Sequence, residues 1–402
     1  MGSGQELAAL EPYLPADSLK RSQGADQDGP SPAARDAARL ALYVHVPFCA
    51  RRCEYCDFAT GTLSGAAVER YLQALELEAE RRAPSASGVA FTSVFFGGGT
   101  PSALSARHFA RVWKTLRDHF ELARDAEITL EANPDDVDAK RAASWRAAGV
   151  NRVSLGVQSL EPLVLRWMHR THTREQVPAA VAALRKGGIE NLSLDLIFGL
   201  PSELERNWEA DLAGALALSP DHLSIYGLTV ESHTPLMHWI ERGETRQAPE
   251  SGFVEQFLTT HARLSESGFD HYEVSNYARP GYRAAHNSAY WRRAPYVGLG
   301  PSAHSGLGNE RRWNLREWAA YDSALGRGES VVAEHEVLTE SALRLEELYL
   351  GLRTTEGLPE PKLPAGQANG WIEAGWMERE RGRLRLTPEG WLRLDALVAE
   401  IA

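Results

Sequence analysis

The sequence lacks long hydrophobic stretches and an excess of basic residues. None of its segments is a run of about 18 apolar residues or the core of a signal peptide, so neither a membrane span nor secretion is favoured. Acidic residues outnumber basic ones by 54 to 43, for a formal net charge of −11. Proteins that bind nucleic acid usually carry a basic surface. We therefore expect a cytoplasmic protein that neither inserts stably into membranes nor binds nucleic acid.

Cysteine is also scarce, and its distribution is informative. All three cysteines lie in one segment, Cys49-Ala50-Arg51-Arg52-Cys53-Glu54-Tyr55-Cys56. Thiolates are the usual ligands of iron–sulfur clusters, and a four-iron cluster takes one ligand per iron. Three cysteines would leave one iron open to a small molecule with its own donor atoms. The alternatives are a zinc site with His45 as fourth ligand, or three unrelated thiols. Free thiols also fit a reducing compartment.

The cysteine segment follows a short apolar run that predicts a strand. This run, Leu40–Val46, is ended by Pro47. In α/β folds the chemistry gathers at the carboxyl ends of the strands, so the cysteine loop is expected at such an end. Aromatic neighbours are expected to shield the site from water, namely Phe48, Tyr55 and Phe58.

Apolar runs alternate with longer amphipathic stretches as far as about residue 232. Strands are expected at 41–46, 90–96, 127–132, 151–157, 192–198 and 222–229. Helices are expected between them at 67–82, 105–119, 138–148, 174–187 and 205–218. Six such repeats predict an α/β fold, a partial parallel (β/α)6 barrel.

Four regions are expected along the chain. Residues 1–38 lack periodicity, which predicts a disordered N-terminal extension. The partial barrel takes residues 39–232. Residues 233–332 form an aromatic and glycine-rich region, with a helix at 250–268 and few clear elements in 271–315. Residues 333–402 have a helix at 339–352, a strand before Thr387 and a final helix, which predicts a mainly helical, winged-helix-like domain that packs or docks a partner.

Glycines and polar residues occur at or near the ends of four of the predicted strands. Gly97-Gly98-Gly99-Thr100-Pro101 follows the strand at 90–96, and glycine allows the backbone to approach a ligand closely. Glu131 and Gln158 end the next two strands, and Asp195 lies within the strand at 192–198. Singly, the glycines could form a tight turn and each polar group could be structural. Together, at equivalent strand ends, they favour a ligand site.

The spacing Cys-x3-Cys-x2-Cys resembles the signature of the radical S-adenosylmethionine (SAM) superfamily, in which SAM binds the open iron. Further motifs, in this order, are similar to the oxygen-independent coproporphyrinogen III oxidase family: Tyr43–Cys49, Gly97–Pro101, Glu131, Gly156–Gln158 and Asp195–Pro201. The similarity covers nearly all of residues 40–402. It implies a partial barrel of radical SAM type that binds a [4Fe–4S] cluster and SAM.

The resemblance also implies roles for individual residues. Cys49, Cys53 and Cys56 would hold the cluster. The SAM site would be lined by Tyr43, Tyr55, Gly98, Gly99, Thr100, Glu131, Gln158, Arg170 and Asp195.

Departures from the family pattern indicate a branch. The decarboxylase has a fourth cysteine two positions after the third, where this chain has Phe58. We also expect the chain to lack the extra N-terminal structure of the decarboxylase. Three segments resemble the heme chaperone branch instead: Tyr272–Tyr277, Tyr296–Ser305 and the His-Asn-x-x-Tyr-Trp element His286–Trp291, which has been linked to heme. The resemblance implies a protein that binds heme and passes it to acceptors, among them membrane-associated respiratory enzymes.

The side chains present could hold heme, but they do not select one iron ligand. Imidazole ligates heme iron, and aromatic rings suit the flat macrocycle. The interpretation we adopt places heme at His286, Tyr290 and Trp291. Other candidates are His304, His45 and His233, with Tyr282 and Tyr296 as further aromatic neighbours. Alternatively, these residues only pack an irregular region against the barrel.

The sequence is compatible with three functions. The leading hypothesis is a heme chaperone that binds a cluster, SAM and heme. The second is a radical SAM coproporphyrinogen III oxidase or another tetrapyrrole-modifying enzyme, although oxidase activity is not expected. The third, of another class, is a zinc-stabilised regulatory protein. Whether SAM is cleaved, and so whether the chain is an enzyme, stays open from the sequence.

Overall fold

The six strands expected from the apolar runs form the centre of one large sheet. The computed structural model describes residues 40–62 and 64–401, so the expected extension at 1–38 lies outside the described residues. The sheet has twelve strands in the order β14-β13-β12-β11-β1-β4-β5-β6-β7-β8-β10-β9. Its central strands pair in parallel: β1 (Leu40–Val46), β4 (Phe91–Gly98), β5 (Leu122–Ala132), β6 (Arg152–Gln158), β7 (Asn191–Phe198) and β8 (His222–Gly227). The α/β fold class with a partial (β/α)6 barrel is confirmed.

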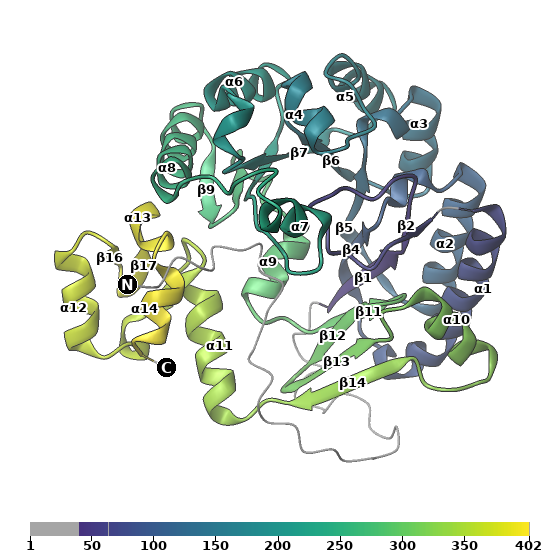
Figure 1. Ribbon diagram of the computed structural model, residues 1–402. Coiled ribbons are helices and arrows are strands. Elements are labelled where there is room, and N and C mark those ends of the chain that lie inside the picture. The colour runs from purple at the N-terminus through teal and green to yellow at the C-terminus, as the bar shows by residue number, and fades with distance from the viewer. Residues whose placement is uncertain (1–39, 63, 402) are drawn as a thin grey trace.

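Helices cover the outside of this curved sheet (Figure 1). Those predicted are α1 (Gly65–Arg82), α2 (Ala106–His119), α3 (Ala139–Ala147), α5 (Gln176–Lys186) and α6 (Trp208–Ala217), each within three residues of its expected ends. Two short helices were not predicted, α4 (Pro162–Trp167) and α7 (Pro235–Glu241). Each spans about two turns or less, which is too short to display a helical repeat.

The central strands present different side chains to their two faces. On β1, Leu42 and Val44 belong to the same apolar core as Leu75 of α1, on the outer face. Because successive strand residues point to opposite faces, the intervening positions lie inside the barrel. These inner positions carry mostly polar or aromatic side chains, for example Tyr43, Ser93, Glu131, Ser154, Asp195 and His222. The interior of the barrel is therefore polar along much of its length.

The prediction of few elements in 271–315 was wrong. Two short strands, β9 (Asp270–Glu273) and β10 (Asn276–Ala278), extend the sheet beyond β8. On the other edge, β11 (Tyr296–Leu299) pairs in parallel with β1, followed by β12 (His304–Leu307), β13 (Glu310–Asn314) and β14 (Val332–Val337) in antiparallel pairs. Most of these strands have three to five residues and β13 is largely charged, so no alternation is visible in the sequence.

The remaining helices and a small sheet complete the structure. Helices α8 (Glu250–Glu266), α9 (Ala285–Trp291) and α10 (Trp318–Gly326) pack on the barrel. The C-terminal lobe contains α11 (Glu340–Leu352), β15 (Leu358–Pro359), α12 (Ala365–Glu373), β16 (Met377–Glu380), β17 (Arg383–Leu386), α13 (Pro388–Trp391) and α14 (Leu394–Ala399). Its strands pair in the order β15-β17-β16. The lobe lies at one side of the barrel in Figure 1.

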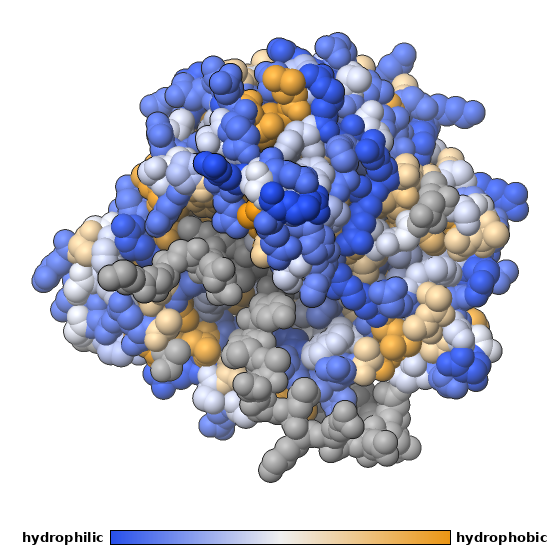
Figure 2. Space-filling view, viewed as in Figure 1, coloured by the Kyte–Doolittle hydropathy of each residue, from blue (hydrophilic) through white to orange (hydrophobic). Residues whose placement is uncertain are grey.

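The surface has no extended hydrophobic belt in the view of Figure 2, where hydrophobic patches are small and separate. Within residues 40–62 and 64–401, no helix is both long and apolar enough to cross a membrane.

Candidate functional site

The three cysteines lie on a loop at the carboxyl end of β1, where the sequence predicts them. The loop begins at β2 (Phe48–Cys49) and closes at β3 (Gly61–Thr62), which pairs with β2 in parallel. All three thiols are free and partly buried. The backbone N–H of Cys56 donates to the carbonyl of Cys53 at 3.2 Å, so the last two thiols belong to one tight turn.

Two polar side chains point at the sulfur atoms. The Thr100 hydroxyl donates to Cys49 Sγ at 3.4 Å, and Arg170 Nη1 donates to Cys53 Sγ at 3.4 Å. Burial raises the pKa of Cys49 and raises that of Cys56 to about 11, so these thiols are protonated at neutral pH unless a metal group displaces the proton. The guanidinium of Arg170 places a positive charge beside the Cys53 sulfur. The loop therefore offers thiol donors with one fixed cation beside them.

The aromatic neighbours of the loop are not equivalent. Tyr55 packs against the apolar cluster that contains Met168 and Ile197, and burial raises the pKa of its hydroxyl. Phe58, expected to shield the site, is 50% exposed and so gives the thiols little cover. That expectation was wrong for Phe58, because about half of its surface is open to solvent.

The glycine turn after β4 holds the cysteine loop in place. Gly99 N–H donates to the carbonyl of Val46 at 2.8 Å, and Thr100 N–H donates to that of Phe48 at 2.7 Å. Gly98 has φ of +101°, and a Cβ there would lie 2.5 Å from the His45 ring. A Cβ on Gly99 would lie 2.6 Å from the Phe48 carbonyl oxygen. Close contacts within the chain are therefore enough to require both glycines, and they bring Thr100 to Cys49.

Two carboxyl groups lie on the same inner face near this edge. Glu131 lies at the carboxyl end of β5. Burial and the charge of Asp195 raise its pKa to about 8, although a hydrogen bond from the Gly98 N–H acts in the opposite direction. Asp195 on β7 accepts hydrogen bonds from Ser154 Oγ at 2.8 and 3.0 Å and from Ser193 Oγ at 3.2 Å. Burial raises the pKa of Asp195 as well, although these serines oppose the shift. A cation bound between the two carboxyl groups would relieve their repulsion.

Arg170 connects these strand ends to the cysteine loop. Its Nη2 donates to Asn133 Oδ1 at 2.5 Å and to the carbonyl of Gly156 at 3.0 Å, while Nη1 contacts Cys53. Its buried Nε has no hydrogen-bond partner among the described residues. A Cβ on Gly156 would lie 3.0 Å from Gln158 Nε2 and 3.4 Å from Arg170 Nη2, so these side chains crowd the end of β6. An unpaired buried donor at this edge is the kind of group that a ligand or water satisfies.

His45 is not placed as a fourth ligand. Its Nε2 donates to the carbonyl of Ala59 at 2.9 Å, and its Nδ1 accepts from the Tyr43 hydroxyl at 3.1 Å. Burial lowers its pKa to about 4. Among the described residues, no group of three or more His, Cys, Asp or Glu side chains is arranged to hold a single metal ion. Because both ring nitrogens of His45 are engaged in this way, His45 does not complete a four-ligand zinc site with the cysteines.

Of the residues predicted for heme, His286 enters the barrel from its amino-terminal end, and its ring reaches the ring of Tyr43, with centres 6.5 Å apart. His286 of α9 is 1% exposed; its Nδ1 bonds with Ser93 Oγ at 3.0 Å, and its Nε2 with the Tyr290 hydroxyl at 2.9 Å. Ser93 lies four residues before Gly97, in the amino-terminal half of the eight-residue β4. The carboxylate of Glu127 accepts the backbone N–H groups of Ala285 and His286, at 3.0 Å each. Helix α9 therefore closes the amino-terminal end of the barrel.

The other aromatic and histidine candidates are dispersed. Trp291 contacts the C-terminal lobe, where the guanidinium of Arg353 lies 4.6 Å from the centre of its ring. His304 is exposed and stacks on Trp313 with ring centres 5.7 Å apart, and His233 is exposed in the loop before α7. The structure thus brings His286 and Tyr290 together and leaves His304 and His233 elsewhere.

The sequence analysis did not identify the residues that hydrogen-bond to the predicted SAM-site side chains. Asn133 binds Arg170, and Ser154 binds Asp195. Ser154 lies beside Glu131 in the register of β5 and β6. Counting alternate, inward-facing positions along the two predicted strands could have identified it. Asn133 directly follows β5 and carries no comparable signal.

Comparison with known proteins relates this chain to one superfamily and to several named proteins. Residues 43–213 match the Radical SAM superfamily. The chain is 38% identical over 365 residues to the heme chaperone HemW of Mycobacterium tuberculosis, covering 89% of this chain and 94% of that protein. It is 37% identical over 338 residues to HemW of Synechocystis, covering 81% and 80%. The fold is similar to that of the coproporphyrinogen III oxidase HemN from Escherichia coli, with a TM-score of 0.77, 24% identity and 91% of each chain covered.

Proposed function

This chain belongs to the HemW family within the radical SAM superfamily, and from that membership we propose that it is a heme chaperone. It binds a [4Fe–4S] cluster, SAM and heme, and it passes heme to acceptor proteins. The observation that carries the proposal is 38% identity over 94% of the length of a HemW protein. A cytoplasmic location and acceptors among membrane-associated respiratory enzymes are part of the same proposal.

The residues at the carboxyl edge suit the cluster and SAM. Cys49, Cys53 and Cys56 would hold the cluster, since the chain has no other thiol. SAM carries an ammonium and a sulfonium cation, and Glu131 with Asp195 supplies two partly buried carboxyl groups to meet positive charge. The other residues proposed to line its site are Tyr43, Tyr55, Gly98, Gly99, Thr100, Gln158 and Arg170. A cluster held there would supply one iron without a protein ligand, to which SAM would bind.

Each protein group then has a defined task. Arg170 donates a hydrogen bond to the Cys53 sulfur, and Thr100 donates one to the Cys49 sulfur. Tyr55 excludes water from one side of the loop through its packing with Met168. The serines around Asp195 fix the direction of its carboxylate.

We expect SAM affinity to rise with pH up to about pH 8 because of Glu131. Its pKa of about 8 means that the carboxyl is protonated at pH 6 to 7 in the free protein and must lose this proton to meet a cation. The apparent Kd should therefore fall by up to about tenfold per pH unit as pH rises to 8, and level off above it. The pH dependence that Glu131 gives to folding stability has the opposite sign. The raised pKa makes Glu131 a group whose contribution to stability declines as pH rises from 4.5 through 8.

Calorimetry of SAM binding to the reconstituted protein at pH 6, 7 and 8 measures this effect. The amino group of SAM itself has a pKa of about 7.8, so the informative quantity is the difference in the pH dependence of Kd between the wild type and Glu131→Gln. The variant should lose the part of the slope due to Glu131. Equal slopes for the two proteins would remove Glu131 from contact with SAM.

The heme ligand we propose is His286, with Tyr290 and Trp291 as aromatic neighbours. Both nitrogens of His286 are engaged inside the barrel, so ligation of iron requires α9 to withdraw. The structure thus corresponds to a closed state of α9 in this proposal. His304 and His233, which are exposed, are the alternative ligands.

Heme transfer without tetrapyrrole decarboxylation is the test of the function. Heme-loaded, reconstituted protein should deliver heme to membranes from heme-depleted cells faster than it loses heme to apomyoglobin, which reports spontaneous release. With coproporphyrinogen III, SAM and a reductant it should form no more protoporphyrinogen than a variant without cysteines. Phe58, at the position of the fourth cysteine of the decarboxylase, supports this second expectation. Steady decarboxylation would favour the oxidase, and transfer no faster than release would contradict the chaperone.

A further inference from the structure

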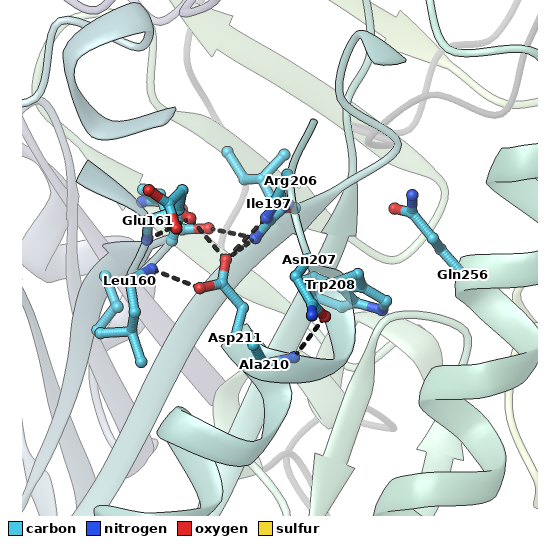
Figure 3. A network of polar contacts seen from close by, with 12 residues as sticks. Leu160, Glu161, Ile197, Arg206, Asn207, Trp208, Ala210, Asp211 and Gln256 are labelled. Carbon is cyan, nitrogen blue, oxygen red and sulfur yellow. Dashed lines mark hydrogen bonds and ion pairs between the residues drawn. The ribbon is translucent and has the colours of Figure 1, made fainter. Parts of the chain in front are cut away.

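A buried ion pair lies directly behind the carboxyl ends of β6 and β7. Arg206 precedes α6 and Asp211 lies within it, and both side chains are 4% exposed. Arg206 Nε donates to Asp211 Oδ2 at 2.7 Å. Figure 3 shows the pair between the turn that contains Leu160 and Glu161 and the strand that contains Ile197. A buried pair of opposite charges contributes little net stability by itself, because its attraction only offsets the cost of burying the two charges. The role of Arg206 and Asp211 therefore depends on their other contacts.

Asp211 holds the turn that follows β6. One of its oxygens accepts the backbone N–H of Leu160 at 2.9 Å, and the other accepts the hydroxyl of Ser159 at 2.5 Å. The same hydroxyl accepts the N–H of Glu161 at 3.1 Å. The turn from Ser159 to Glu161 is thus fixed by a carboxylate that α6 supplies.

Arg206 holds the ends of the two strands. Its Nη1 donates to the carbonyl of Ile197 on β7, and its Nη2 donates to the carbonyl of Gln158 on β6 at 3.3 Å. The central carbon of its guanidinium lies over the Trp208 ring, 4.5 Å from the ring centre. The planar guanidinium therefore connects both strand ends to Asp211 in one fixed geometry, which a lysine could not do.

Gln158 needs this support because of its backbone. It has φ of +62°, in the left-handed region that side chains other than glycine seldom adopt. The register of β6 against β7 shifts at the same place, between Gly156 and Gln158. Such conformations persist where the surrounding structure enforces them, and they are common at ligand sites. Here the contacts that enforce it come from Arg206 at the Gln158 carbonyl and from Asp211 in the next turn.

We propose that Arg206 and Asp211 are positioning residues for the SAM site. They hold Gln158 in its left-handed conformation and so aim its side chain toward Gly156 and Arg170. This inference rests on the proposed role of Gln158 in SAM binding. Neither residue touches the ligand, and each acts through the backbone of β6.

A second Arg–Asp pair in the same barrel provides a matched control. Arg185 Nη2 donates to Asp221 Oδ2 at 2.9 Å and to the carbonyl of Ser219 at 3.1 Å, and Asp221 accepts the N–H of Leu192 at 3.1 Å. This pair also holds loop backbone, but at the amino-terminal ends of β7 and β8. It is far along the strands from Gln158, so its loss should cost stability alone.

The test compares SAM affinity by calorimetry in reconstituted Arg206→Lys, Arg185→Lys and Gln158→Ala. Thermal unfolding of the same samples measures any general loss of stability. Arg206→Lys keeps a charge beside Asp211 but loses the shared geometry, and it should weaken SAM binding about tenfold. Arg185→Lys should leave the affinity within about twofold. Ser159→Ala, a milder change in the same turn, should weaken binding about threefold and replaces Arg206→Lys if that variant does not fold.

A double-mutant cycle decides whether Arg206 acts through Gln158. In the Gln158→Ala background, Arg206→Lys should cause no further loss of SAM affinity. Independent, additive losses would overturn the proposal, and so would equal affinities for Arg206→Lys and Arg185→Lys. If Gln158→Ala alone binds SAM like the wild type, the premise fails instead. That outcome is recognised from the single variant and removes Gln158 from the proposed SAM site.

Discussion

Replacing any one of Cys49, Cys53 or Cys56 by alanine is expected to abolish the [4Fe–4S] cluster. The chain has three thiols, with Cys49 in β2 and the other two on the loop between β2 and β3. Each would ligate one iron, so two remaining thiolates would hold a four-iron cluster at two corners only. No other cysteine can replace a missing ligand, and both nitrogens of His45 are already hydrogen-bonded. The loss should therefore be complete rather than partial.

Iron and sulfide analysis with visible absorption after anaerobic reconstitution measures this loss. Arg52→Ala is the matched control within the loop, because the Arg52 side chain contacts the carbonyl of Cys56 and no sulfur. It should retain stoichiometric iron. Unfolding of the cluster-free proteins should be the same for Cys53→Ala and the wild type, because the loop lies outside the main sheet. The assignment would be falsified if the triple alanine variant assembled the same cluster.

The centre of the fold could be predicted because its strands are long and apolar on one face. Strands such as β1 and β7 have seven or eight residues, with buried aliphatic side chains at alternating positions. The helices between them face the same core, so the alternation of the two patterns identifies the barrel. The cysteine loop was placed correctly for a local reason, since Pro47 ends the first strand immediately before it.

Elements that depend on distant contacts could not be predicted. Strand β10 has three residues and exists because it pairs with β8 and β9. Helix α9 has seven residues, and Glu127, more than 150 positions earlier, accepts its first N–H groups. Nothing near α9 in the sequence indicates that its histidine enters the barrel. Tertiary contacts decide such short segments, and a single sequence does not display them.

In the candidate site, too, local sequence patterns identified some residues, and residues that depend on distant contacts were missed. Glu131 and Asp195 were found because a charged residue in an apolar strand stands out, and the structure places them close enough for one charge to affect the other. The glycines at 98 and 99 were found too, but the expected reason was a ligand, whereas contacts with His45 and Phe48 already require them. Arg206 was missed because its partners are the backbone carbonyls of two other strands, which leave no mark in the sequence.

His286→Ala is expected to destabilise the protein by about 3 kcal/mol, whatever its role in heme binding. The substitution leaves a cavity in the barrel and removes the ring that stacks on Phe95 with centres 5.0 Å apart. It also leaves the Ser93 hydroxyl without its imidazole partner. Urea unfolding of the variant and the wild type measures the loss. His271→Ala is the matched control, since His271 is also buried, is hydrogen-bonded through both nitrogens and is stacked on Tyr277.

Stability alone cannot tell an iron ligand from an anchor, but Tyr290→Phe can. Burial lowers the pKa of His286 to about 3, so its ring is neutral, the form that ligates iron, at any physiological pH. The phenylalanine variant removes the hydroxyl that bonds Nε2 and keeps the ring that packs against Tyr296. Losing this hydrogen bond weakens the closed state of α9 by about 1 kcal/mol, so the open state becomes about fivefold more populated.

Heme affinity then moves in opposite directions in the two variants if His286 ligates iron from the open state. Tyr290→Phe should bind heme about fivefold more tightly, because a larger fraction of molecules is competent to bind. His286→Ala should lose the saturable Soret change, while His271→Ala should keep it. If His286 serves only to anchor α9, neither Tyr290→Phe nor His286→Ala should change heme affinity, and the exposed His304 and His233 become the ligands to test. Titration of the folded variants with heme under reducing conditions, at equal protein concentration, distinguishes the two cases.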